Sequence, residues 1–307
     1  MGELIALLVA VSWTATAVFA EIATKRLGTL VVNVVRMGLS VILLSLILFI
    51  FTGSPIPQSM NTQTVMWFGL SGIVGYVIGD YCLYKCYTYI GSRFGQLIMT
   101  LSSLFAAVAG YLLLSETIPL KAGLGMTITI IGIGISVLNK GTNGKKVELK
   151  LSATGILLGL GAAMGQGVGL VLSKMGMEAY KLAAHGESEA VLNMMPFAGT
   201  LTRGIIGFLG FAALLVASGG TAPFKQGLHD RKGMTFALLC SIFGPVIGVS
   251  LSLLAVSLAN TGIAQTIMSI SPVLILAPAY FIFKQRITLM EIIGAVISVA
   301  GVVTLIL

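Results

Sequence analysis

Ten stretches of the sequence, each of roughly 20 residues, are largely apolar, and they constrain the fold more than any other feature. A helix needs about 20 largely apolar residues to cross the hydrocarbon core of a bilayer. The stretches cover residues 3–21, 30–52, 65–89, 94–115, 119–138, 153–175, 194–218, 233–258, 263–283 and 288–307. The sequence therefore predicts an all-α integral membrane protein with ten transmembrane helices.

The composition excludes the soluble alternatives. Hydrophobic residues make up 57% of the chain and charged residues only 9%, whereas soluble domains carry about 25% charged residues. A transmembrane barrel would alternate apolar and polar residues over segments of about 10 residues, and residues 41–48 do not alternate. Because the first stretch begins with Glu3 and is followed by Lys25 and Arg26, we interpret it as a retained helix rather than a cleaved signal, which needs positive charge before its apolar run.

The second half of the chain repeats the first. A shift of 169 residues aligns residues 73–138 with the last part of the chain without a gap, so the third to fifth stretches match the eighth to tenth. Matched segments are Gly75–Gly79 with Gly244–Gly248, Gln96 with Gln265, and Tyr111 with Tyr280. A repeat of five helices must enter the membrane from the opposite face in its second copy. We therefore predict two inverted five-helix repeats, 1–140 and 153–307, joined by a basic linker at 141–152.

Lysine and arginine are sorted between the two sets of predicted loops. One set holds twelve of them, namely Lys25, Arg26, Arg93, Lys140, Lys145, Lys146, Lys150, Lys225, Arg231, Lys232, Lys284 and Arg286. The other set holds three, Lys121, Lys174 and Lys181. Positively charged short loops stay in the cytoplasm, so both termini are expected outside the cell. These charges form no folded basic surface with groove-reading elements, so no nucleic acid is expected as a partner.

Asp80 is the sharpest candidate for a functional residue inside the predicted spans. Ionisable residues within a membrane are costly and are functional candidates by default. Tyr76, Asp80, Tyr84 and Tyr87 recur at helical spacing and share one face. The Asp80 carboxylate could carry a proton or meet a substrate cation there. The alternative is a structural aspartate that is paired with Lys85 or bonded to helix ends.

Two further polar stripes lie in the fourth and ninth stretches. Gln96, Thr100 and Ser103 follow one another at helical spacing, and the repeat matches them with Gln265, Ser269 and Pro272. Such a stripe suits the wall of a polar cavity, although serine, threonine and glutamine also join helices by hydrogen bonds. Pro272 is expected to kink its helix and free a backbone carbonyl near the cavity.

Other intramembrane residues complete the candidate site. Trp13 lies in the middle of the first stretch, where it either lines a cavity or packs in the core, and Gln166 occupies the matching position. Glu21 precedes Lys25 by four residues, which favours an ion pair at the membrane interface. Arg36 and Arg203 lie about two turns inside their spans, where an arginine can gate, stabilise the structure or bind a carboxylate or phosphate.

The sequence resembles the drug/metabolite transporter superfamily, specifically its ten-helix EamA-type members. The residues that carry the resemblance span the whole chain and are Trp13-Thr14, Arg36, Arg203, Ser271-Pro272-Val273, Ser115-Glu116, Gly132 and Gly301. The resemblance implies a multi-pass transporter of the cell membrane that exports a small molecule.

We therefore expect a secondary-active transporter that moves a small polar or amphipathic metabolite by alternating access, with proton coupling through Asp80 as a hypothesis. No nucleotide-binding motif occurs, and neither a metal site, another cofactor nor enzymatic activity is expected. Lipids surround the chain, which is predicted to be a monomer or weak dimer. The alternatives are a passive channel or facilitator for small solutes, a membrane enzyme and a receptor.

Overall fold

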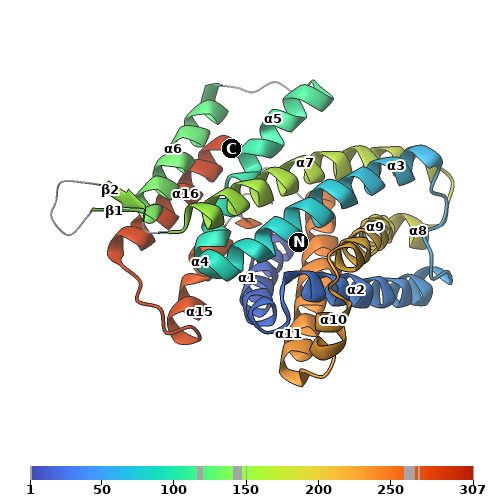
Figure 1. Cartoon of the computed structure of the whole chain (residues 1–307). Coiled ribbons are helices and arrows are strands. Elements are labelled where there is room, and N and C mark those ends of the chain that lie inside the picture. Colours follow the sequence, from blue (N-terminus) through green and yellow to red (C-terminus); the bar gives the residue numbers. More distant parts are fainter. Residues whose placement is uncertain are drawn as a thin grey trace.

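The computed structural model describes residues 2–115, 120–140, 147–149, 151–258, 267–268 and 270–306 (Figure 1). Long helices dominate it. The first half of the chain contains α1 (Gly2–Leu27), α2 (Thr29–Thr52), α3 (Thr62–Ser71), the π-helical η1 (Gly72–Asp80), α4 (Tyr81–Met99), α5 (Ser102–Leu114) and α6 (Leu120–Val137). The second contains α7 (Ala153–Ala183), α8 (Glu189–Asn193), α9 (Met195–Ala217), α10 (Thr221–Gly227), α11 (Arg231–Ser241), the π-helical η2 (Ile242–Val249), α12 (Ser250–Leu258), α14 (Ser271–Leu274), α15 (Leu276–Phe281) and α16 (Leu289–Ile306).

Six helices of the described residues are long and apolar enough to cross a membrane. They are Leu4–Leu27, Thr29–Thr52, Thr62–Met99, Ala153–Ala183, Met195–Ala217 and Arg231–Ala255. Four shorter apolar helices cover Ser102–Leu114, Gly123–Ser136, Ser271–Phe281 and Leu289–Thr304. Each of the ten apolar stretches in the sequence thus contains an apolar helix. Large apolar side chains on their outer faces are exposed, including Ile42, Leu112, Leu157 and Val216, as expected for a surface covered by lipid.

The helices of the two halves pack in matching pairs. α2 lies against α9, and α6 lies against α16 (Figure 1). α1 packs on the continuous segment α11–η2–α12, and α7 packs in the corresponding way on α3–η1–α4. Each half therefore inserts its first helix against the third helix of the other half.

Two π-helical segments lie at matching positions of the repeat. The shift of 169 residues places η1 on residues 241–249, and η2 covers Ile242–Val249. A π-helix widens the turn and commonly marks a functional site inside an α-helix. In η2 the segment includes Pro245, which has no N–H to donate to the preceding turn. Neither segment was predicted from the sequence.

The predicted helix 94–115 is interrupted, so the prediction of one continuous span is wrong there. α4 ends at Met99 and α5 begins at Ser102, inside this predicted span. The positive φ of 76° at Gly91 instead falls between the predicted spans 65–89 and 94–115. Thr100 donates its backbone N–H to Leu97 at 3.2 Å, three residues back, instead of four, and its hydroxyl also bonds the Leu97 carbonyl at 2.7 Å. A threonine that bonds the backbone in this way competes with regular helix.

The prediction of a purely helical chain also needs a small correction at the junction of the halves. β1 (Leu138–Lys140) and β2 (Val147–Leu149) pair antiparallel, with Leu138 opposite Leu149. The linker predicted at 141–152 therefore includes a strand. After this junction, α7 continues to Ala183, well beyond the end predicted at residue 175.

Candidate functional site

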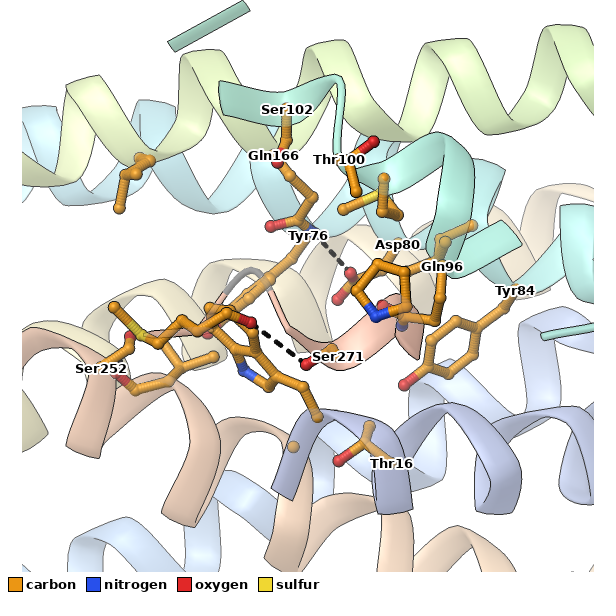
Figure 2. Close-up of a pocket in the computed structure, with 18 of the residues that line it drawn as sticks. Thr16, Tyr76, Asp80, Tyr84, Gln96, Thr100, Ser102, Gln166, Ser252 and Ser271 are labelled. Carbon is orange, nitrogen blue, oxygen red and sulfur yellow. Dashed lines mark hydrogen bonds between the residues drawn. The ribbon is translucent and has the colours of Figure 1, made fainter. Parts of the chain in front are cut away.

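A cavity of about 210 Å³ lies between the two halves. A single water needs only about 10–15 Å³ on the same measure, so the cavity has room for a small solute. Its wall contains thirteen of the side chains singled out in the sequence, namely Trp13, Arg36, Tyr76, Asp80, Tyr84, Tyr87, Gln96, Thr100, Ser103, Gln166, Arg203, Ser271 and Pro272. Figure 2 shows Asp80, Tyr84, Gln96 and Gln166 arranged around it.

Asp80 links three helices at the wall of this cavity. One carboxylate oxygen accepts a hydrogen bond from Nη2 of Arg36 in α2. The other accepts from Nε2 of Gln166 in α7 at 2.6 Å (Figure 2). The side chains of Arg36 and Asp80 are only 4% and 7% exposed. The partner of Asp80 is therefore Arg36, not Lys85, so the pairing expected as the structural alternative is wrong.

The guanidinium of Arg36 is held by hydrogen bonds at Nη2 and by an aromatic ring. Nη2 also donates to Oδ1 of Asn33 at 3.1 Å, and Asn33 in turn donates to the Thr29 carbonyl at 3.0 Å. The guanidinium carbon lies 4.7 Å from the ring centre of Tyr84, within the range of a cation–π contact. Asn33 was not among the predicted site residues, although a polar residue three positions before an intramembrane arginine was a usable signal.

Arg203 reaches the same cavity from α9 but has a different environment. Its guanidinium carbon lies 4.5 Å from the ring centre of Tyr76, and its side chain is buried. No hydrogen bond or ion pair to Arg203 occurs among the described residues, and its Nε is buried without a partner. The two arginines of the repeat are therefore not equivalent.

A row of tyrosines forms one wall of the cavity. Tyr84 and Tyr87 stack with ring centres 5.8 Å apart. The Tyr84 hydroxyl contacts Sγ of Cys240 at 3.0 Å, and Gln96 donates to the Tyr87 hydroxyl at 2.8 Å. Tyr76, Tyr84 and Tyr87 all line the cavity with Asp80, as their shared helix face indicated.

Close backbone contacts between η1 and α7 bring Gln166 to Asp80. A Cβ atom on Gly165 would lie 2.8 Å from the Cα of Gly79 and 2.8 Å from the carbonyl oxygen of Val74. Only glycine allows this approach. Gln166, the next residue, then also donates to the carbonyl of Gly75 at 3.0 Å.

Glu21 does not line the cavity. Its carboxylate accepts from Nζ of Lys25 at 2.5 Å, which is the pair that their spacing favoured. It also accepts from the backbone N–H of Ser92 at 2.5 Å. This N–H follows the break at Gly91 and has no partner in its own helix, so Glu21 of α1 caps the restarted helix. Glu21 thus has a structural contact that the sequence did not reveal.

The ninth stretch is only partly described. Gln265 and Ser269 lie outside the described residues. Pro272 occupies the first turn of α14, where the missing N–H of proline costs no helical hydrogen bond. Next to it, the Ser271 hydroxyl donates to the carbonyl of Ala10 in α1 at 3.0 Å. Thr16 and Ser252 also line the cavity, and neither was singled out in the sequence.

Comparison with known proteins agrees with this architecture. The sequence profile described as "EamA-like transporter family" matches residues 1–138 and again residues 153–307. The chain belongs to the EamA-like transporter family. This membership makes it a multi-pass membrane transporter, and it fits the two-repeat arrangement. Among the described residues no group of three metal-binding side chains occurs.

The fold is also found in a solved structure. A crystal structure, whose title says only that it is of a protein, aligns with a TM-score of 0.59. It covers 99% of this chain and 95% of its own, at 13% sequence identity. At that identity the similarity concerns the fold alone. No curated protein matches the sequence significantly.

Proposed function

We propose that this EamA-like protein is a secondary-active transporter that exports a small polar or amphipathic metabolite by alternating access. The single observation that carries the proposal is a central cavity lined by both halves, with a buried ion pair in its wall. In transporters built from inverted repeats, the substrate binds between the repeats, and one repeat then rocks against the other. Ten membrane crossings arranged as two inverted sets of five belong to this proposal.

The packing of the helices supports two structurally related halves. α1 and α7 make corresponding contacts, and the pairs α2–α9 and α6–α16 join matching helices. The two π-helical segments fall at equivalent positions. A pseudo-two-fold axis between the halves accounts for all of these pairs, and rocking about that axis would expose the cavity to each side in turn.

Asp80 is the proposed site of proton coupling. Its carboxylate lies in the cavity wall and is bound by the guanidinium of Arg36 and the amide of Gln166. A proton taken up by Asp80 would weaken both contacts and release Arg36, which changes the charge of the cavity. The same group can therefore sense protons and substrate, which is the requirement for coupling the two movements.

The test begins with a thermal-shift screen of the purified full chain against small metabolites. A stabilising compound is then loaded into proteoliposomes, and uptake of its labelled form against an equal unlabelled pool is measured. A carrier exchanges label across the membrane. A channel instead gives conductance far above carrier turnover and no exchange, and that result would refute the proposal.

Variants of two cavity residues refine the test. Trp13→Ala is expected to abolish the stabilising shift, because Trp13 lines the cavity. Asp80→Asn is expected to reduce transport and remove its dependence on pH. If Asp80→Asn leaves both transport and its pH dependence unchanged, the proposal of proton coupling through Asp80 is wrong. The carrier function is tested separately, by the exchange assay.

A further inference from the structure

We infer that the cavity takes an anionic solute and that Arg203 binds its carboxylate or other oxyanion. The charges in the wall give the first reason. Among the described residues that line the cavity, the charged side chains are Arg36, Asp80 and Arg203. Asp80 neutralises Arg36 through their ion pair. One positive charge, that of Arg203, is left over in the cavity wall.

The repeat shows where the missing negative charge would have been. The shift of 169 residues that matches Gly75 with Gly244 places Asp80 on Val249. Val249 also lines the cavity. The first half thus has an arginine and an aspartate at these two positions, and the second half has an arginine and a valine. Arg203 lacks the counterpart that balances Arg36.

The guanidinium groups of Arg36 and Arg203 occupy equivalent places in the two halves. The two arginines therefore differ in their partners and not in their positions. A Cβ on Gly75 would meet Nη2 of Arg203 at 3.0 Å, and a Cβ on Gly244 would meet Nη1 of Arg36 at 3.8 Å. Each arginine therefore reaches the matching glycine of the opposite half. Only Arg36 finds a carboxylate there among the described residues.

The surroundings of Arg203 suit an anion. Its guanidinium stacks on the Tyr76 ring, which orients the planar group and leaves its N–H donors for a ligand. The Tyr76 hydroxyl is buried without a hydrogen-bond partner among the described residues. A buried, uncompensated charge is costly, and an oxyanion bound to Arg203 would remove that cost. Trp13, Leu253 and Met268 supply apolar wall, which favours an amphipathic anion.

The inference deepens the proposed function, and its test uses three probes of one shape. Benzoate, benzamide and benzylamine share a ring and differ in charge, and inorganic phosphate provides a second oxyanion. Binding to the purified full chain is measured by calorimetry and by the unfolding temperature at neutral pH. Benzoate or phosphate is expected to bind at least about tenfold more tightly than benzamide and benzylamine. Phosphate preferred over benzoate would support the oxyanion site and assign the phosphate form of the solute.

Four variants locate the charge that is responsible. Arg203→Gln should abolish anion binding, and Arg203→Lys should keep the preference for anions. Val249→Asp keeps Arg203 but adds the carboxylate that the second half lacks, and it should abolish binding as well. Lys225→Gln removes one positive charge from the exposed surface of α10 and should change nothing. If Arg203→Gln does not fold, the inference is still tested by the binding of benzoate, benzamide and benzylamine to the wild-type protein and by the Val249→Asp variant.

Several outcomes would overturn the inference. They are equal binding of benzoate and benzamide, a preference for benzylamine, anion binding that survives in Arg203→Gln or Val249→Asp, and no binding of either anion. The transport proposal is judged separately by label exchange. If benzylamine binds and exchanges, the transport proposal is supported and the anion inference is refuted. If benzoate binds but does not exchange, the anion inference is supported and the transport proposal is refuted.

Discussion

Arg36 and Asp80 meet where water hardly reaches, and this determines what each contributes to stability. Two charges that leave water lose several kcal/mol of solvation each, and their attraction compensates only when the geometry is good. Here one oxygen of Asp80 binds Arg36 and the other binds Gln166. The ion pair therefore stabilises the protein only when both partners are present. If one partner is removed, the other is left as an uncompensated charge in a buried site.

This coupling predicts non-additive effects of mutation. Arg36→Gln and Asp80→Asn are each expected to destabilise the protein by about 3–5 kcal/mol, the usual cost of breaking a buried pair. The double variant is expected to be more stable than either single variant, because no unpaired charge remains from the pair. Denaturant unfolding of the four proteins in one detergent measures the coupling. Strictly additive losses would show that the two residues do not act as a pair.

At the residue scale, the sequence identified most of the cavity side chains but not their partners. Asp80, Arg36 and Gln166 stood out because ionisable and amide groups are rare in apolar helices. Asp80 pairs with Arg36 and not with Lys85 because of how α2 and η1 are packed. No local sequence pattern contains that information. Glu21 is a second case, since its bond to Ser92 joins residues 71 positions apart.

At the scale of elements, small residues determine how closely η1 and α7 approach. Gly165 faces Gly79 and Val74, and both contacts would be backbone atoms at 2.8 Å from an added Cβ. Backbone cannot move aside as a flexible side chain can. The distance between these helices in turn sets the hydrogen bond from Gln166 to Asp80.

Gly165→Ala is therefore expected to destabilise the protein by about 1–3 kcal/mol through overpacking, and to lower affinity for any cavity ligand by moving Gln166. Gly69→Ala in α3 is the matched control, because nothing lies within 4 Å of a Cβ there. Alanine favours a helix over glycine by up to about 1 kcal/mol, so the control should be neutral or stabilising. Equal unfolding temperatures for the two variants would argue against the close contact.

The elements themselves were largely predictable, and their interruptions were not. A run of 20 apolar residues indicates a helix without ambiguity. α2 and α9 follow their stretches closely, whereas α1 and α7 continue beyond theirs. The break at Gly91 falls between the stretches 65–89 and 94–115, but its capping by Glu21 of another helix, which accepts from the buried N–H of Ser92, could not be predicted. The π-helical turns of η1 and η2 lie where α7 and α1 of the opposite half pack against them. Such features arise from contacts that a single-helix pattern does not encode.

At the scale of the molecule, ion pairs join the two halves at the end where the basic loops lie. Arg26 of α1 forms two hydrogen bonds to Asp230 before α11, at 2.8 and 2.9 Å. This guanidinium holds the pKa of Asp230 below its ordinary value. Arg93, which was counted among the loop charges, is instead largely buried and pairs with Glu291 at 3.2 Å. Alternating access would require such contacts between the halves to part.

The two ends of the molecule can be told apart by single residues. The last turn of α2 packs beside the start of α9, where Leu48 and Ala198 share one core cluster. The segment after α2 therefore lies at that end. α10 lies at the other end, because Gly227 packs against Val31 at the start of α2. Gln63, in the first turn of α3, and Gln226 of α10 are exposed at these opposite ends.

The lysine and arginine bias predicts which end faces the cytoplasm. Both termini are expected outside, so Gln63 should face the exterior and Gln226 the cytoplasm. With Cys82, Cys86 and Cys240 replaced by serine, Gln63→Cys should react with a membrane-impermeant maleimide in intact cells. Gln226→Cys should react only after the membrane is opened, and label exchange by the cysteine-free protein confirms that it still functions. The reverse labelling pattern would place the termini in the cytoplasm. It would also show that the lysine and arginine bias does not set the orientation of this chain.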